Sequence, residues 1–284
     1  MRIQISHHTR YEYDRTVQFN PHLLYMRPRE NPLLTVDSFS FTFSPEATIQ
    51  WMRDDFDNLP ASAQFFLQSD LLEIRSDCTV TTTDLPPFDF LVRDYARAFP
   101  FEYEPLHRFN LGIYLEPPDE ETQSVVKRWI QENFPSQPSD TVSWIFALNQ
   151  ALYQNLSYKR RDEAGIQTSI QTLQQGGGSC RDYAVALIDC ARTLGIAARF
   201  VSGYLHDPLV DGNASGDMHA WAEIFLPGAG WRGIDPTNGI FCQNAYVPVA
   251  HAVVAESVNP IQGSFQSRTP AFAKLRNDVR VRSR

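Results

Sequence analysis

The sequence predicts an α+β protein in which an all-β N-terminal domain precedes a region of mixed helices and strands. Strand-like alternation of apolar and polar residues dominates residues 1–84. Segments with apolar residues at helical spacing follow, and extended patterns come after them. The helical segments are 119–134, 139–155 and 180–194, and the extended segments are 196–204, 218–226 and 231–235.

The N-terminal region has the strand spacing of a β-sandwich. Phe39, Phe41 and Phe43 alternate with small polar residues, which is typical of a half-buried strand. His7 and His8 are neighbours on an expected strand and face opposite ways, so we interpret them as a surface pair and not as a metal site. The domain is expected to support or gate the rest of the chain.

A connector and two helices are expected next. Proline and aromatic residues are frequent over residues 85–118, which indicates an ordered connector packed between domains. A first helix is predicted from Asp119 to Phe134, with acidic residues in its first turn. Ser139 is the expected N-cap of a second helix, which ends near Asn155.

The stretch Gly176-Gly177-Gly178-Ser179-Cys180 is the most informative part of the chain. The glycines permit positive φ and close backbone approach, and Ser179 is a favourable helix N-cap. Cys180 is therefore expected on the first turn of a buried helix, where unpaired N–H groups and the helix dipole stabilise a thiolate. The segment by itself fits two interpretations, an activated nucleophile or a small buried hydrophobic residue.

A histidine and an aspartate follow on an expected β-hairpin, 39 and then 16 residues further along the chain. Side chains alternate faces along a strand, so a register that pairs Leu226 with Gly230 places His219 and Asp235 diagonally on one face. Taken singly, His219 is more typical of a structural histidine and Asp235 of a turn former. With the cysteine, they supply the nucleophile, the base and the residue that orients the base.

A resemblance to the transglutaminase-like superfamily rests on three linked segments, GGGSCRDYAVALIDCARTLGIAARFVSGYL, DMHAWAEIFLPGAGWRGIDPTNG and YVPVAHAVVAESVNPIQGSF. The resemblance is to the bacterial branch, often described as cysteine proteases. It implies a papain-like core, with helices packed on an antiparallel sheet and catalytic residues at the positions of Cys180, His219 and Asp235. The N-terminal stretch resembles the β-rich domain that precedes the core in this branch. Arg181 departs from the branch, which usually has an uncharged polar residue there.

Three residues are weighed as supporting groups. The resemblance places an aromatic residue near the nucleophile at Tyr158, where it is either an oxyanion donor or a packed tyrosine. Asp182 either supports the site or simply complements the helix dipole. Trp221 shares the face of the histidine and either shields the His–Asp pair or belongs to the core. The backbone N–H of Cys180 is the preferred oxyanion donor, and the loop 206–217 is expected to overhang the cleft.

Composition limits the classes of partner and cofactor. The net charge of −8 disfavours general nucleic-acid binding, and no apolar run approaches the length of a membrane helix. The cysteine and histidine spacings match no zinc pattern, and no calcium-loop pattern is visible. The N-terminal residues have no apolar signal core. We therefore expect a cytoplasmic protein that needs no metal or cofactor and binds neither nucleic acid nor membrane, with its oligomeric state open.

The remaining cysteines and the C-terminus have ordinary interpretations. Cys78, Cys190 and Cys242 are expected to be small core or strand residues, and Cys190 lies about 15 Å along the helix from the nucleophile, too far for a disulfide. Residues 264–284 carry six Lys or Arg against one Asp. We interpret them as a basic tail, preferably a solvated or loosely docked end and alternatively an interaction segment.

The predicted function is acyl transfer through a thioester on a peptide or protein substrate, at a peptide or carboxamide bond. Hydrolysis by a peptidase or amidase is preferred because of the bacterial-branch resemblance and the expected cytoplasmic setting. The alternatives are a protein-glutamine transglutaminase, with an amine acceptor, and a catalytically silent peptide-binding scaffold. The expected divisions are a β-sandwich at 1–84, a connector at 85–118, a catalytic core at 119–263 and the tail at 264–284.

Overall fold

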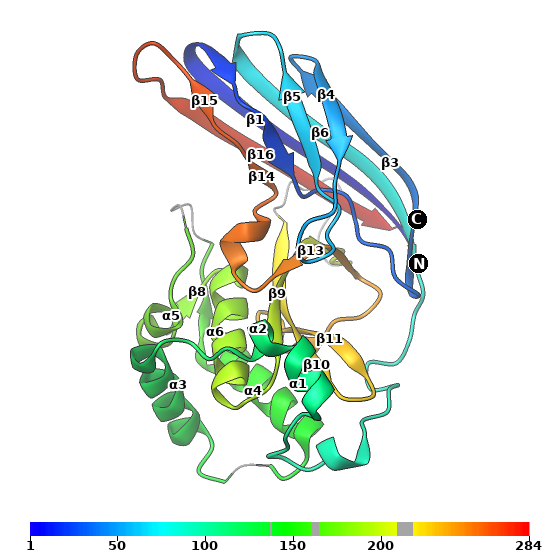
Figure 1. Cartoon of the computed structure of the whole chain (residues 1–284), viewed down its shortest axis with the longest axis vertical. Helices are drawn as coiled ribbons and strands as arrows, with labels where there is room; N and C mark the ends of the chain where they lie inside the picture. The colour runs from blue at the N-terminus through cyan, green and yellow to red at the C-terminus, as the bar shows by residue number, and fades with distance from the viewer. Residues whose placement is uncertain (137, 161–164, 209–217, 284) are drawn as a thin grey trace.

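The computed structural model describes residues 1–136, 138–160, 165–208 and 218–283. A β-rich domain lies at one end of the molecule, and helices pack on a separate sheet at the other end (Figure 1). The sheets are antiparallel apart from one short two-stranded pair. The predicted α+β class is therefore confirmed.

Two sheets form the N-terminal domain. One has the order β15-β1-β6-β3, with β16 also paired to β1, and the other has the order β14-β2-β5-β4. Buried side chains of both sheets, among them Phe19, Phe65 and Ile74, form one apolar cluster, as expected of a sandwich. The strands are β1 Arg2–Phe19, β2 His22–Leu24, β3 Leu34–Ser44, β4 Ala47–Trp51, β5 Ala61–Phe65, β6 Ser69–Thr82, β14 Ile261–Gln262, β15 Phe265–Gln266 and β16 Ala273–Ser283.

The C-terminal residues form a strand of this domain. β16 pairs with β1 in antiparallel register, from Tyr13 opposite Ala273 to Ile3 opposite Ser283, so the two chain ends lie side by side (Figure 1). Val279 is only 2% exposed and Val281 is partly buried, whereas Arg280 and Arg282, which alternate with them, face solvent. The prediction of a solvated or loosely docked end is wrong, because the high charge of the segment concealed a period-two strand pattern.

Val279→Ala is expected to lower the free energy of unfolding by about 2 kcal/mol, because it removes buried methyl groups where β16 meets the core. Leu275→Ala on the same strand is the matched control. Leu275 is 56% exposed, so its truncation is expected to cost less than about 0.5 kcal/mol. Urea denaturation of both variants measures the difference, and equal costs would contradict the docked strand.

His7 and His8 occupy different environments. His8 faces outward, with its ring 3.6 Å from the Glu73 carboxylate. His7 is 2% exposed, and its ring lies 3.1 Å from the Tyr204 hydroxyl and 2.9 Å from the Asn277 side-chain oxygen. The surface-pair interpretation is therefore wrong for His7, because this face of β1 packs on Tyr204 of β9 and the His7 ring also contacts Asn277 of the neighbouring strand β16.

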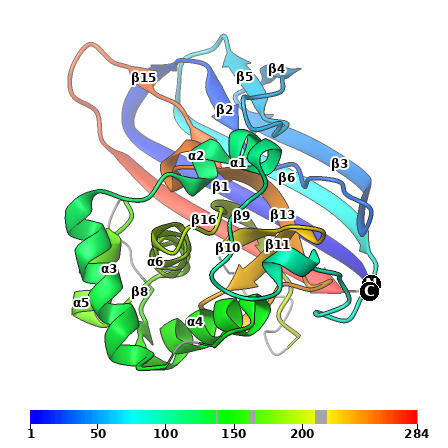
Figure 2. The ribbon, with the colours of Figure 1, turned by 60° about the horizontal axis from the view of Figure 1, so that its bottom comes forward.

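The core domain is a sheet of order β12-β11-β10-β9-β13, with α6 packed on one face and rings of the short helices α1 and α2 against the other. Figure 2 shows α6 between α3 and this sheet. The strands are β7 Ser157–Tyr158, β8 Gly177–Gly178, β9 Ala198–Leu205, β10 His219–Leu226, β11 Gly230–Asp235, β12 Ile240–Phe241 and β13 Tyr246–Ala252. The helices are η1 Asp94–Ala96, α1 Pro105–Asn110, α2 Gly112–Leu115, α3 Glu120–Asn133, α4 Thr141–Asn155, α5 Ser169–Gln175, α6 Cys180–Thr193 and η2 Ala255–Val258.

The N-caps of α3 and α4 lie at or next to the residues where the sequence predicted these helices to begin. Asp119, where the first helix was predicted to begin, is its N-cap and accepts a hydrogen bond from the Thr122 backbone. Asp140 caps α4 through a 2.8 Å bond from the Ser143 backbone, where Ser139 was expected. Ser139 and Asp140 are both favourable capping residues, and only the backbone path decides between such neighbours.

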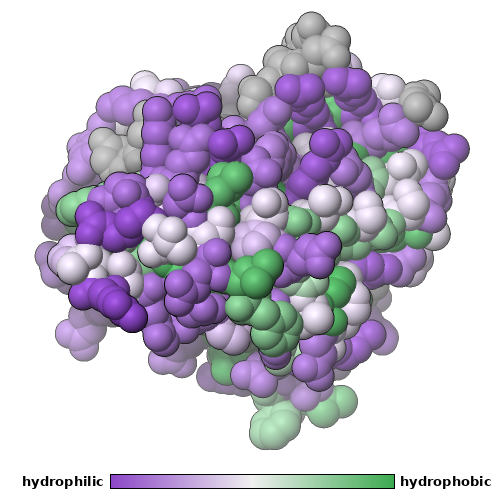
Figure 3. Space-filling view, turned by 90° about the horizontal axis from the view of Figure 1, so that it is seen from above, coloured by the Kyte–Doolittle hydropathy of each residue, from purple (hydrophilic) through white to green (hydrophobic). Residues whose placement is uncertain are grey.

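The outer face of the N-terminal domain is mainly hydrophilic, with apolar side chains scattered among polar ones (Figure 3). In the described parts of the chain, no helix combines the length and the apolar character that a bilayer span requires.

Candidate active site

The start of α6 is built around a buried carboxylate. Asp182 is fully buried, and its Oδ2 accepts hydrogen bonds from the Ser179 backbone (2.7 Å) and the Ser179 hydroxyl (2.8 Å). Its Oδ1 accepts from the Gln167 backbone at 2.7 Å. Asp182 therefore fixes the loop and the helix that carry Cys180, which favours the structural interpretation of this residue over a direct chemical role.

The glycines before Cys180 are required by close packing. Gly176 ends α5 with a left-handed φ of 66°. Gly177 and Gly178 form β8, which pairs with β7. A Cβ on Gly177 would overlap the Ser157 carbonyl, and a Cβ on Gly178 would lie 2.8 Å from the Asp182 carboxylate. Only glycine leaves enough space at positions 177 and 178 for the backbone to pass between β7 and Asp182 before α6 begins.

Gly177→Ala is expected to destabilise the protein by about 1–3 kcal/mol or more and to displace the start of α6, because the backbone of β7 blocks the added methyl group. Gly112→Ala is the control, since a Cβ there meets nothing within 4 Å. That control is expected to stay within about 0.5 kcal/mol of wild type. Thermal unfolding of both variants checks the comparison, and equal melting temperatures would refute the packing argument.

The hairpin has the predicted register. Leu226 pairs with Gly230, and continuing this register sets Asp235 across from Trp221 and diagonal to His219. The His219 Nε2 atom lies 2.8 Å from Asp235 Oδ2, so this nitrogen donates to the carboxylate. The side chain of Asp235 is fully buried and that of His219 is 13% exposed. The hydrogen bond between these two side chains is therefore largely shielded from solvent.

His219 also contacts the nucleophile candidate. Cys180 is 9% exposed at the start of α6, and its sulfur lies close enough to the His219 ring to help raise the pKa of that ring. Because Nε2 is engaged by Asp235, Nδ1 is the ring nitrogen that remains for the sulfur. Burial by itself lowers the pKa of His219, but the hydrogen bonds and charges of Asp235 and Cys180 outweigh it and raise the pKa to about 10. The imidazole is therefore favoured in its protonated, cationic form.

Asp235 is held by more donors than the sequence indicated. The Tyr246 hydroxyl and the Asn238 side-chain amide each donate to Oδ2 at 2.7 Å, and the Thr237 backbone donates to Oδ1 at 2.8 Å. Burial opposes ionisation, but these bonds and the charge of His219 lower the pKa of Asp235. An Asx-turn pattern after Asp235 was a usable signal for Asn238. Tyr246 had none, because pairing of β13 with β9 brings it there.

The two aromatic candidates have different environments. Trp221 is 2% exposed, with ring centroids 6.2 Å from His219 and 5.3 Å from Tyr246. Trp221 therefore packs against the His–Asp pair and also belongs to the buried core. Tyr158 is 56% exposed on β7, opposite Gly178. Burial, and to a smaller extent the nearby Tyr158, raise the pKa of Tyr183. An oxyanion role for Tyr158 stays a prediction.

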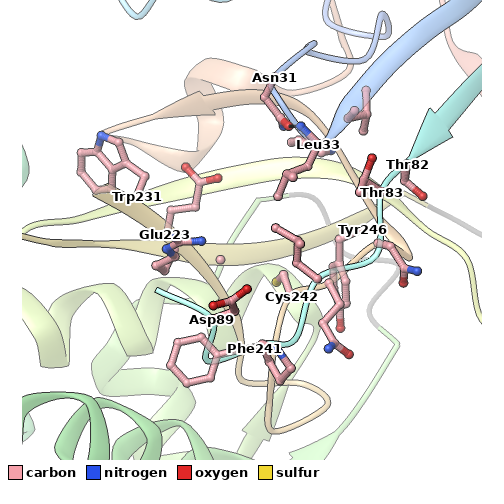
Figure 4. Close-up of a pocket in the computed structure, with 18 of the residues that line it drawn as sticks. Asn31, Leu33, Thr82, Thr83, Asp89, Glu223, Trp231, Phe241, Cys242 and Tyr246 are labelled. Atoms are coloured by element: carbon pink, nitrogen blue, oxygen red, sulfur yellow. Dashed lines mark hydrogen bonds between the residues drawn. The ribbon is translucent and has the colours of Figure 1, made fainter. Parts of the chain in front are cut away.

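A cavity of about 170 Å³ lies behind this group, where the N-terminal domain and the connector meet the core sheet. Trp221 and Tyr246 line it, so the residues that support the His–Asp pair also form a wall of this cavity. Figure 4 shows Glu223 and Trp231 at one end and Tyr246 toward the other, with Cys242 between them. Glu223 is paired with Arg199 at 2.6 Å, which neutralises its charge.

Other residues singled out in the sequence lie as follows. Cys78 and Cys190 are buried, and Cys242 is partly buried; none of them forms a disulfide. In the described ranges, no three histidine, cysteine or carboxylate side chains gather as metal ligands. Residues 209–217 of the loop expected to overhang the cleft lie outside the described residues.

Comparison with known families agrees with this architecture. Residues 128–236 match the transglutaminase-like superfamily core, and residues 3–81 match the bacterial transglutaminase-like N-terminal region. The chain carries both of these transglutaminase-like domains. The superfamily predicted from the sequence motifs is thus confirmed.

Relatives of this transglutaminase-like protein include chains of unknown and of named activity. An uncharacterised protein of Mycobacterium tuberculosis is 26% identical over 280 residues, which span 92% of this chain and 87% of the relative. A protein-glutamine gamma-glutamyltransferase of Pseudomonas aeruginosa is 40% identical over 88 residues, or 28% of this chain and 13% of that protein. A proposed cysteine protease from Cytophaga hutchinsonii shares the fold, with a TM-score of 0.71 at 17% identity over 99% of this chain and 98% of that one.

Proposed function

We propose that this transglutaminase-like protein is a cysteine-dependent enzyme that hydrolyses a peptide or carboxamide bond through a thioester. The observation that supports the proposal is the position of the His219 ring, which bonds to Asp235 through Nε2 and lies close to the Cys180 sulfur. A peptide-binding scaffold has no use for such a buried, charged set, because burying charges costs free energy.

The reaction follows from where the proton lies. With the proton on His219, the Cys180 thiolate attacks the carbonyl carbon and forms a C–S bond, while the carbonyl electrons move to oxygen. The His219 imidazolium gives its proton to the leaving nitrogen as the C–N bond breaks. Neutral His219 then takes a proton from water, which attacks the thioester and releases the acid and the Cys180 thiolate. Asp235 keeps the ring oriented throughout.

The oxyanion is expected to form at the start of α6. As the first residue of the helix, Cys180 has a backbone N–H with no partner inside the helix, and the helix dipole adds positive potential there. Such fixed donors stabilise the charge that develops on the carbonyl oxygen. Tyr158 is the second donor in this proposal.

The test is capture of an acyl adduct on Cys180 from a peptide library, detected by mass spectrometry after acid quench. An adduct that maps to Cys180 and turns over to free acid supports hydrolysis. The segment shared with the gamma-glutamyltransferase favours an amine as the second candidate acceptor, so the assay includes a primary amine. Amine product exceeding acid would replace hydrolysis by transamidation, and no adduct from any peptide would contradict the proposal.

A further inference from the structure

We propose that Tyr246 is a positioning residue for the acyl-transfer reaction and acts on His219 through Asp235. One oxygen of this carboxylate, Oδ2, accepts from His219 Nε2 at 2.8 Å and from the Tyr246 hydroxyl at 2.7 Å. The kinetic consequence of the inference rests on the proposed function. The hydrogen bonds to the shared oxygen can be measured without turnover.

The hydroxyl of Tyr246 is committed to this contact. Tyr246 is 6% exposed, and its ring packs edge-on against Trp221 at 5.3 Å. Burial, with the neighbouring Cys242 and Asp235, raises the pKa of Tyr246, so the hydroxyl keeps its proton and donates. The charge of Asp235 is therefore divided between the imidazole and the phenol, together with the Asn238 amide on the same oxygen.

The titratable groups around Asp235 come from separate elements. His219 faces it from β10, and Tyr246 faces it from β13. The Cys242 thiol approaches from the segment before β13 and stays neutral, because burial raises its pKa. The only positive charge among these three groups is that of His219. Removing the Tyr246 donor is thus expected to concentrate the carboxylate charge on the bond to His219.

Two consequences follow for Tyr246→Phe, which keeps the ring and removes the hydroxyl. The carboxylate becomes a stronger acceptor, so the proton between His219 and Asp235 shifts to lower field in its ¹H NMR spectrum. Asp235 also loses a bond that lowers its pKa, so acidification abolishes this signal about one pH unit higher than in wild type. The acid limb of kcat/KM is expected to move up by the same amount while KM stays within about twofold, because Tyr246 acts through Asp235 and not on substrate.

Tyr204→Phe is the matched control. Tyr204 is also a buried tyrosine, and its hydroxyl bonds to His7 and to the Met26 carbonyl, away from Asp235. Loss of that hydroxyl removes the same group from a buried site, so any general effect on packing appears in both variants. We expect Tyr204→Phe to leave the low-field signal and the acid limb where they are in wild type.

The experiment measures the low-field proton signal and kcat/KM against pH in wild type, Tyr246→Phe and Tyr204→Phe. A shift confined to Tyr246→Phe supports the inference, and an unchanged signal in the folded variant overturns it. If the signal shifts but wild type has no turnover, the positioning contact stands and the proposed function fails. Should Tyr246→Phe not fold, 3-fluorotyrosine at position 246 replaces it. As a stronger donor it is expected to move the signal to higher field, and no movement would overturn the inference.

Discussion

Cys180→Ala is expected to lower turnover by about 10⁴-fold or more and to eliminate the acyl adduct, because the atom that forms the thioester is lost. The substitution removes one sulfur from a site whose frame is set by Ser179 and Asp182, so the fold is expected to survive. Steady-state hydrolysis of the captured peptide, with circular dichroism to check folding, measures the result.

Cys190→Ala is the control for this change. Cys190 is fully buried on the same helix, and burial raises the pKa of its thiol, so it stays a neutral packing group. We expect this variant to retain turnover within about threefold while losing some stability. Comparable losses in the two variants would show that the effect of Cys180→Ala comes from the helix and not from the sulfur.

Asp235→Asn has the second largest expected effect, a loss of about 10²- to 10³-fold in kcat/KM, because the imidazole loses its anionic partner and its fixed orientation. The pH profile shows the direction in which the pKa of His219 changes. The charge of Asp235 helps to raise the pKa of His219 to about 10, so imidazolium persists to that pH in wild type. With a neutral amide, His219 releases its proton at lower pH, and the basic limb of kcat/KM is expected to move down toward about 6.5.

The measurement is kcat/KM from pH 5 to 10.5 for wild type, Asp235→Asn and the surface control Asp94→Asn. Asp94 has a side chain that is 92% exposed, so its neutralisation is expected to leave both the rate and the profile unchanged. A basic limb that stays in place in Asp235→Asn would mean that Asp235 does not support the charge on His219.

Much of the site's frame could be predicted from the sequence because it is local. The Gly-Gly-Ser-Cys stretch specifies a close-packed entry and a capped helix, and both are dictated within a few residues. The hairpin register is likewise local, since a short turn fixes which residues of β10 and β11 face each other. Cys180 meets His219 through a non-local contact, which the spacing alone could not establish and the family resemblance implied.

The missed features arise from contacts between distant segments. Tyr246 reaches Asp235 because β13 pairs with β9, and no sequence pattern near either residue records that pairing. The C-terminal strand was missed because its alternating basic residues outweigh two inward valines in any count of charge. His7 is buried because β1 packs on the core, so strand alternation correctly separated it from His8 but did not show that its face was covered.

The most direct test of the central claim is the rate of alkylation of Cys180 by iodoacetamide at pH 6, with the modified cysteine located by mass spectrometry. A thiolate held by protonated His219 is predicted to react at Cys180 far faster than a free thiol does at that pH, and to slow when His219 is replaced by alanine. A rate at Cys180 equal to that of a free thiol, unchanged by His219→Ala, would contradict the account.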